Sequence, residues 1–319
     1  MKLLLRSSLV NSIKVPSVIE QITTRNLVPT IPLHDSAVAI ESERHANDFV
    51  CATTPTGTHY HHYGSTKVGK LPLILLHPLA GNSSNWIEII ELLRGNSDVY
   101  ALDLPNHGES SYLMETASTE SYNEWLETTL NELKLKRIHL AGLSLGGRIA
   151  AYFADTRSER LGSLILFAPA LNPAFKSLTL NDDLLIRGAI DLGAQTLIRF
   201  SVWNILKSIV ATEDPQKRMV LRYAFESLII DQERRSYGGL MMNIDWIKLD
   251  DGSSIDWQRI ASQVPVSVYY GSADGYCPSQ RSLIPSIDGI MIEEVKAVGH
   301  LLPFEDPNYT VEIIKSIIG

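Results

Sequence analysis

Gly142-Leu143-Ser144-Leu145-Gly146 places a serine between two glycines, each two residues away from it. Residues 137–141, just before this segment, favour a short buried strand, and residues 147–153, just after it, favour a helix. A strand, a glycine-flanked serine and a helix in immediate succession form a nucleophile elbow, which lifts a serine hydroxyl out of a sheet. The glycines let this turn close, because a Cβ atom at either position would collide with the neighbouring strand or helix.

A serine hydroxyl becomes a nucleophile only when a base removes its proton and a carboxylate orients that base. In the elbow architecture the acid and then the base follow the serine along the chain. Residues 266–270 predict a buried strand, and Asp274 lies just past its carboxyl end, whereas the preceding predicted strand has no carboxylate at its tip. His300 is the only histidine after Ser144. Asp274 and His300 are therefore the candidate acid and base.

These pieces give the chain a resemblance to the α/β-hydrolase family over roughly residues 48 to 319. The matching segments occur in family order: residues 77–81, residues 103–110, the serine elbow, residues 271–274, and Gly299-His300 before a last helix. The resemblance implies an α/β fold with a mostly parallel, doubly wound sheet. It also implies that Ser144 is the nucleophile, His300 the general base and Asp274 the acid that orients it.

The resemblance further implies an oxyanion hole made by two backbone N–H groups. One belongs to Leu145, at the start of the helix, and the other to the turn after a strand at residues 71–76, where the family's donor maps to Leu79. Pro78 stands where the family commonly has glycine, and proline has no N–H to donate. Leu79 or Ala80 must therefore provide the second N–H, and Leu79 is the predicted donor.

Alternating strand and helix patterns predict the parallel sheet independently of the resemblance. Strands are predicted at 71–76, 99–102, 137–141, 163–167, 266–270 and 291–295, and helices at 85–93, 120–133 and 145–154. Between about 171 and 250 the apolar residues recur at helical spacing, which predicts helices. The resemblance implies that this segment is a helical cap inserted between strands six and seven of the fold, here 163–167 and 266–270. We therefore expect a core of residues 48–170 and 251–319, a cap at 171–250, and an N-terminal extension at 1–45.

Residues 49–53 and 58–63 predict an antiparallel hairpin at the edge of the sheet. In a strand, His59 and His61 share one face and His62 points to the other. Because no cysteine or carboxylate stands beside them at ligand spacing, we expect exposed strand histidines and no metal site.

The sequence also has no glycine-rich phosphate loop, so we expect no cofactor. Asp103 and His107 precede Ser144, and we expect them to shape the pocket.

The composition restricts the partners of this 319-residue chain. A formal net charge of −8 argues against nucleic acid, and no apolar run reaches the length needed to span a bilayer. Two cysteines are too few for a disulfide framework.

The first acidic residue is Glu20, and the basic, serine-bearing stretch before it is typical of a transit peptide. We expect a mitochondrial protein if the source is a eukaryote, and otherwise a cytoplasmic one with a loosely docked extension.

The function that these residues favour is hydrolysis of a carboxylic ester or thioester through an acyl-enzyme. The apolar content of the predicted cap favours a small or medium hydrophobic acyl substrate. Alternatives on the same three residues are acyl transfer to an alcohol, lactone opening, and C–C bond hydrolysis or elimination. A non-catalytic ligand receptor is a further alternative, because a fold alone does not establish a function.

Overall fold

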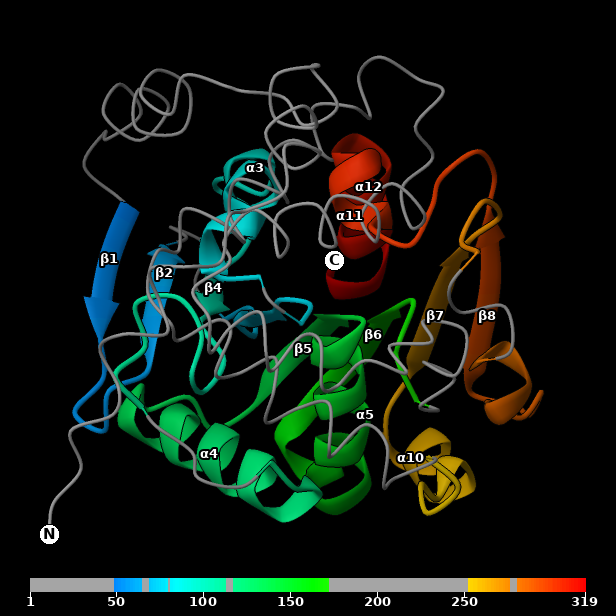
Figure 1. Cartoon of the computed structure of the whole chain (residues 1–319), viewed down its shortest axis with the longest axis horizontal. Helices are drawn as coiled ribbons and strands as arrows, with labels where there is room; N and C mark the ends of the chain where they lie inside the picture. Colours follow the sequence, from blue (N-terminus) through cyan, green and yellow to red (C-terminus); the bar gives the residue numbers. More distant parts are fainter. Residues whose placement is uncertain (1–48, 65–68, 80, 113–116, 172–251, 276–279) are drawn as a thin grey trace, which may run out of the picture. The chain divides into compact units, whose positions relative to one another are not determined.

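The computed structural model describes residues 49–64, 69–79, 81–112, 117–171, 252–275 and 280–319. Within them, eight strands form one sheet in the order β1-β2-β4-β3-β5-β6-β7-β8 (Figure 1). The strands are β1 Phe49–Thr53, β2 His59–Tyr63, β3 Leu73–Leu76, β4 Val99–Leu102, β5 Ile138–Leu143, β6 Leu161–Phe167, β7 Val266–Gly271 and β8 Ile290–Val295. β2 is antiparallel to β1 and β4, and all other pairs are parallel. The predicted mostly parallel sheet and its edge hairpin are confirmed.

Helices cover both faces of this sheet. They are α3 Ile87–Leu92, α4 Thr119–Glu132, α5 Leu145–Arg157, α10 Trp257–Gln263, α11 Leu302–Glu305 and α12 Pro307–Ile318, with short 3₁₀ helices η1 Ser83–Trp86, η2 Ser158–Arg160 and η3 Gln280–Leu283. α4, α5 and α10 pack together on one face, and α3 packs against α12 on the other (Figure 1). This arrangement is the doubly wound architecture that the sequence predicts.

Side-chain caps explain where several helices begin. Ser118 accepts a hydrogen bond from the backbone of Ser121, whose side chain accepts one from Ser118 N–H, so α4 begins with a capping box. Asp306 caps α12 and is followed by a proline at its first position. The predicted helix at 85–93 is instead a 3₁₀ turn, η1, followed by α3. Asn82 caps η1 and places the start of the helical segment earlier than predicted.

The core lies against both faces of the central strands. All four residues of β3 are fully buried, as are the last four of β6. Parallel strands buried on both faces have continuous apolar sequences, which is why Leu73–Leu76 was readable as a strand. The predicted N-terminal extension at 1–45 and all of the predicted cap except Leu171 lie outside the described residues. In the part of the chain that is described, no helix has the length and apolar character to cross a membrane.

Candidate active site

The nucleophile elbow is built by the close approach of three backbone segments. Ser144 follows β5 directly, precedes α5 directly and has φ 55° and ψ −111°, a strained conformation for a residue other than glycine. A Cβ atom on Gly142 would collide with the carbonyl of Gly146, and one on Gly146 would collide with the carbonyl of Leu76. Glycine is therefore required at both flanking positions, and the predicted strand–serine–helix turn is present.

His300 and Asp274 meet although they lie far apart in sequence. The Nδ1 atom of His300 is 2.9 Å from Oδ2 of Asp274, and both side chains are almost fully buried. Backbone packing brings them together, because a Cβ atom on Gly271 would collide with the carbonyls of Val298 and Gly299, just before His300. The N–H of Ala273 also donates to the carbonyl of Val298 at 2.9 Å. The loops after β7 and β8 are in backbone contact, and this contact holds the predicted acid and the predicted base in one hydrogen bond.

Ser144, Asp274 and His300 lie at the same edge of the sheet. They follow β5, β7 and β8, and the carboxyl ends of neighbouring parallel strands share one edge. Ser144 N–H donates to the carbonyl of Phe167, and Ala168 N–H donates to that of Tyr269, so the strand ends are linked across β6. The three residues are 7%, 8% and 3% exposed. This edge therefore carries both the serine of the elbow and a carboxylate-supported imidazole.

The turn after β3 lies beside the elbow. Leu76 pairs with Gly142, and the turn at Pro78–Gly81 is closed by a 3.0 Å hydrogen bond from Gly81 N–H to the Pro78 carbonyl. Leu79 is partly exposed within this turn, whereas Ala80 lies outside the described residues. Leu145 is the first residue of α5, where backbone N–H groups have no partner within the helix. The two predicted oxyanion donors therefore come from neighbouring backbone segments.

A family model for the alpha/beta hydrolase fold matches residues 72–307. The chain belongs to this family. The matched range starts just before β3 and includes the elbow, Asp274 and His300.

Relatives of this hydrolase include carboxylesterase YbfK of Bacillus subtilis, which is 27% identical over 274 residues, 80% of this chain and 86% of that protein. The dihydrolipoyllysine-residue acetyltransferase component of the acetoin cleaving system of Pseudomonas putida is 25% identical over 240 residues, 74% of this chain but only 60% of that protein. An esterase from Thermogutta terrifontis has the same fold, with a TM-score of 0.66, 20% identity, and coverage of 86% of this chain and all of that one. The chain is an enzyme of the hydrolase class.

Glu305 holds the backbone of the candidate site, a contact that the sequence pattern did not predict. Its two carboxylate oxygens accept hydrogen bonds from the N–H groups of Gly299, at 2.9 Å, and Leu301, at 3.2 Å. These residues flank His300, so one buried carboxylate in α11 holds the backbone on either side of the imidazole. The signal in the sequence was an acidic residue directly after the apolar segment Leu301-Leu302-Pro303-Phe304 that follows His300.

His77 supports the turn that carries Leu79. Its Nδ1 atom is 2.7 Å from the Pro78 carbonyl, and its Nε2 atom accepts a hydrogen bond from Leu104 N–H at 2.9 Å. Burial, followed by the nearby His107, lowers the pKa of His77 to about 3. A neutral imidazole with its proton on Nδ1 satisfies both contacts. His77 therefore joins the turn to the loop after β4 without carrying a charge.

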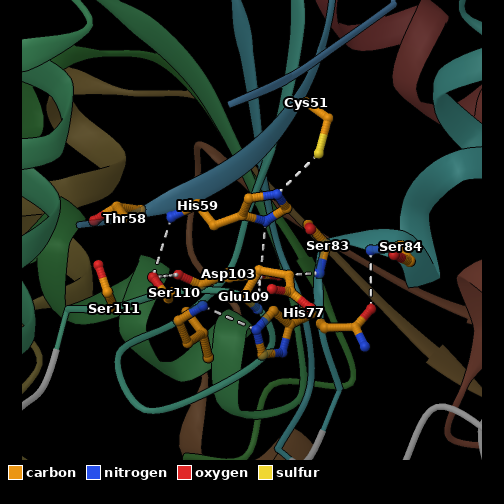
Figure 2. Close-up of polar contacts among 12 residues, drawn as sticks. Cys51, Thr58, His59, His77, Ser83, Ser84, Asp103, Glu109, Ser110 and Ser111 are labelled. Carbon is orange, nitrogen blue, oxygen red and sulfur yellow. Dashed lines mark hydrogen bonds and ion pairs between the residues drawn. The ribbon is translucent and has the colours of Figure 1, made fainter. Parts of the chain in front are cut away.

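Asp103 organises the neighbouring loops, as Figure 2 shows. Its carboxylate accepts hydrogen bonds from the N–H groups of Ser83 and Glu109 and contacts His59. These contacts fit the structural role expected for this residue. The expectation of exposed strand histidines is wrong, because His59 and His61 are only 6% and 5% exposed. β2 is not the outermost strand but lies between β1 and β4, which explains their burial.

Proposed function

We propose that this hydrolase cleaves a carboxylic ester or thioester through an acyl-enzyme, with Ser144 as nucleophile, His300 as base and Asp274 as orienting acid. The observation that carries the proposal is the His300–Asp274 hydrogen bond at the sheet edge where the strained elbow presents Ser144. An ionised carboxylate has no proton to donate and acts only as an acceptor. Asp274 therefore fixes the proton of His300 on Nδ1 and leaves the lone pair on Nε2.

The proposed reaction has two halves. Nε2 of His300 takes the Ser144 proton as Oγ attacks the carbonyl carbon, and the tetrahedral intermediate collapses as His300 gives that proton to the leaving alcohol or thiol. A water molecule then attacks the acyl-enzyme, again with His300 as base, and the proton returns to Ser144 Oγ as the acid leaves. Asp274 stabilises the imidazolium in both halves.

The N–H groups of Leu79 and Leu145 are the proposed donors to the oxyanion. Leu145 stands at the positive end of α5, where negative charge is stabilised. Leu79 is supported by the closed turn and by His77 beneath it. Loss of one oxyanion donor costs about 10²–10³ in turnover, so the position of this turn has a direct effect on rate.

The proposed substrate is a small molecule with an apolar acyl group. The apolar residues of the segment between β6 and β7 support this substrate class, as does the similarity to the B. subtilis carboxylesterase. Acyl transfer to an alcohol is the second candidate, favoured by the similarity to the P. putida acetyltransferase component. Both reactions pass through the same acyl-enzyme and differ only in the nucleophile that resolves it.

A fluorophosphonate probe tests the nucleophile, and the chain offers a matched control. Ser163 Oγ lies 2.7 Å from Nδ1 of His139, so it is a second serine–histidine pair, but at the opposite ends of β5 and β6 from the elbow. We expect the probe to label wild type and Ser163→Ala but not Ser144→Ala. Labelling of a folded Ser144→Ala variant at the wild-type rate would disprove the assignment.

Activity assays with p-nitrophenyl esters and acyl-CoA thioesters of graded chain length determine the substrate class. We expect turnover of one of these series and a fall in kcat of at least about 10⁴-fold in His300→Ala. Product analysis with ethanol present separates the candidates, because hydrolysis releases only the free acid and transfer yields an ethyl ester. Wild-type turnover in His300→Ala would exclude His300 as the base.

A further inference from the structure

Cys51, His59 and His61 converge on one face of the β1–β2 hairpin. Cys51 pairs directly with His61, and Thr53 pairs with His59, so Cys51 and His59 are diagonal neighbours. The Sγ atom of Cys51 is 3.0 Å from Nε2 of His59 (Figure 2). One possible ligand atom from each of the three residues lies within 4.8 Å of the others. Cross-strand register therefore supplies the cysteine that the local sequence lacks beside the histidines.

His62 does not belong to this group. Its ring stacks on Tyr100 with centroids 4.0 Å apart, and its Nε2 atom lies 3.5 Å from the carboxylate of Asp98. This placement confirms the sequence prediction that His62 points away from His59 and His61. The hairpin thus provides its own internal comparison, a third histidine on the opposite face.

Asp103 orients His59 for binding through Nε2. Its Oδ2 atom lies 2.8 Å from Nδ1 of His59, and its carboxylate also accepts backbone N–H groups from Ser83 and Glu109. Because Nδ1 faces Asp103, the Nε2 atom on the other side of the His59 ring faces the sulfur of Cys51. A carboxylate behind a ligating histidine is a common feature of metal centres.

We propose that Cys51, His59 and His61 bind a divalent transition-metal ion of the zinc type, with a fourth position open to water or an external ligand. One thiolate and two imidazoles are ligands that zinc prefers, and three protein ligands leave one tetrahedral position vacant. Zn–S and Zn–N bonds of about 2.3 and 2.0 Å place sulfur and nitrogen about 3.5 Å apart. The distance between Cys51 Sγ and His59 Nε2 is 3.0 Å, so it needs to lengthen by only about half an ångström to hold the ion.

The burial and exposure of the three side chains also fit a metal site. His59 and His61 are held in the sheet, while Cys51 is exposed on the edge strand β1 and leaves a path for the ion. Binding displaces the Cys51 thiol proton to solvent, so affinity rises with pH. The bound ion would link β1 to β2 and, through His59 and Asp103, to the N–H of Ser83 at the start of η1. β1 and β2 lie at the opposite side of the sheet from β7 and β8.

The test is a titration of the chelator-treated full chain with Co²⁺, whose thiolate complex has a ligand-to-metal charge-transfer band, followed by displacement with Zn²⁺. We expect one ion per chain, a charge-transfer band that is lost in Cys51→Ser, and affinity at least about 100-fold lower in His61→Gln. His62→Gln is the matched control and should bind as wild type does. Cys51 is exposed, so its substitution leaves the core intact.

Alkylation of Cys51 by iodoacetamide, measured on its peptide by mass spectrometry, gives a second readout. Saturating Zn²⁺ should slow this reaction at least tenfold in wild type but not in His61→Gln. The proposal is overturned if the Co²⁺ complex of wild type has no thiolate band, if His61→Gln binds as tightly as wild type, or if Zn²⁺ leaves the alkylation rate unchanged.

Discussion

Replacing His77 by glutamine should make the protein's stability less sensitive to acid. In the folded state His77 donates to the Pro78 carbonyl from Nδ1 and accepts from Leu104 N–H at Nε2. A proton on Nε2 would face that N–H and would break the contact. This geometry agrees with the direction of the shift, since burial followed by His107 lowers the pKa of His77 from 6.5 to about 3.

The size of the effect follows from linkage. Because the folded-state pKa is depressed, the unfolded chain binds more protons between about pH 6.5 and pH 3, and the stabilisation present above that window is lost as the pH falls through it. Between pH 7 and pH 5 an unfolded histidine takes up most of one proton while His77 in the folded state stays neutral. The free energy of unfolding therefore falls by about 2 kcal/mol from this residue alone.

Urea unfolding followed by tryptophan fluorescence, at pH 8, 7 and 5, measures this quantity. From pH 7 to pH 5 the free energy of unfolding of wild type should fall by about 2 kcal/mol more than that of His77→Gln. Between pH 8 and pH 7 the two proteins should change in parallel, since neither state of His77 takes up much proton there. An equal loss in both proteins from pH 7 to pH 5 would mean that folded His77 protonates normally, and would refute the reasoning.

Two further predictions concern the loops of the candidate site. Gly146→Ala should lower the free energy of unfolding by about 1–3 kcal/mol or more, because the new Cβ meets the Leu76 carbonyl, whereas Gly64→Ala makes only ordinary contacts and should be neutral in the same urea titration. Glu305→Gln should lower kcat with little change in KM, because the backbone on both sides of His300 loses a charged acceptor, at a stability cost of about 1–3 kcal/mol. Unchanged kcat in a destabilised Glu305→Gln would limit Glu305 to a purely structural role.

Secondary structure was most predictable where burial leaves a simple pattern. β4 has the bounds that the sequence predicts, Val99–Leu102, because a short and mostly buried apolar run is distinctive. The segment at 85–93 was less predictable, because the capping contacts of Asn82 and Asn85 decide where its helical structure begins and what type its first turn has. Helix ends depend on such single hydrogen bonds, which apolar periodicity does not encode.

The sequence by itself determined the elbow and its candidate partners. Gly142 is required by a backbone contact within the turn and Gly146 by the carbonyl of Leu76 in β3, but the spacing of both around Ser144 is visible along the chain. Chain order and a single downstream histidine then left His300, with Asp274 at a predicted strand end. The strand, the serine with its two glycines, and the helix are consecutive in the sequence, so the elbow can be recognised before the fold is known.

Only the tertiary structure decided which distant side chains touch. His300 contacts Asp274 because the loops after β7 and β8 pack against each other, and Cys51 reaches His59 because the β1–β2 register places them diagonally. Strand alternation predicts the face on which a residue lies, but not the residue opposite it, since a change of register exchanges every cross-strand partner. Contacts of this kind depend on packing between segments, and the order of residues along one segment does not contain them.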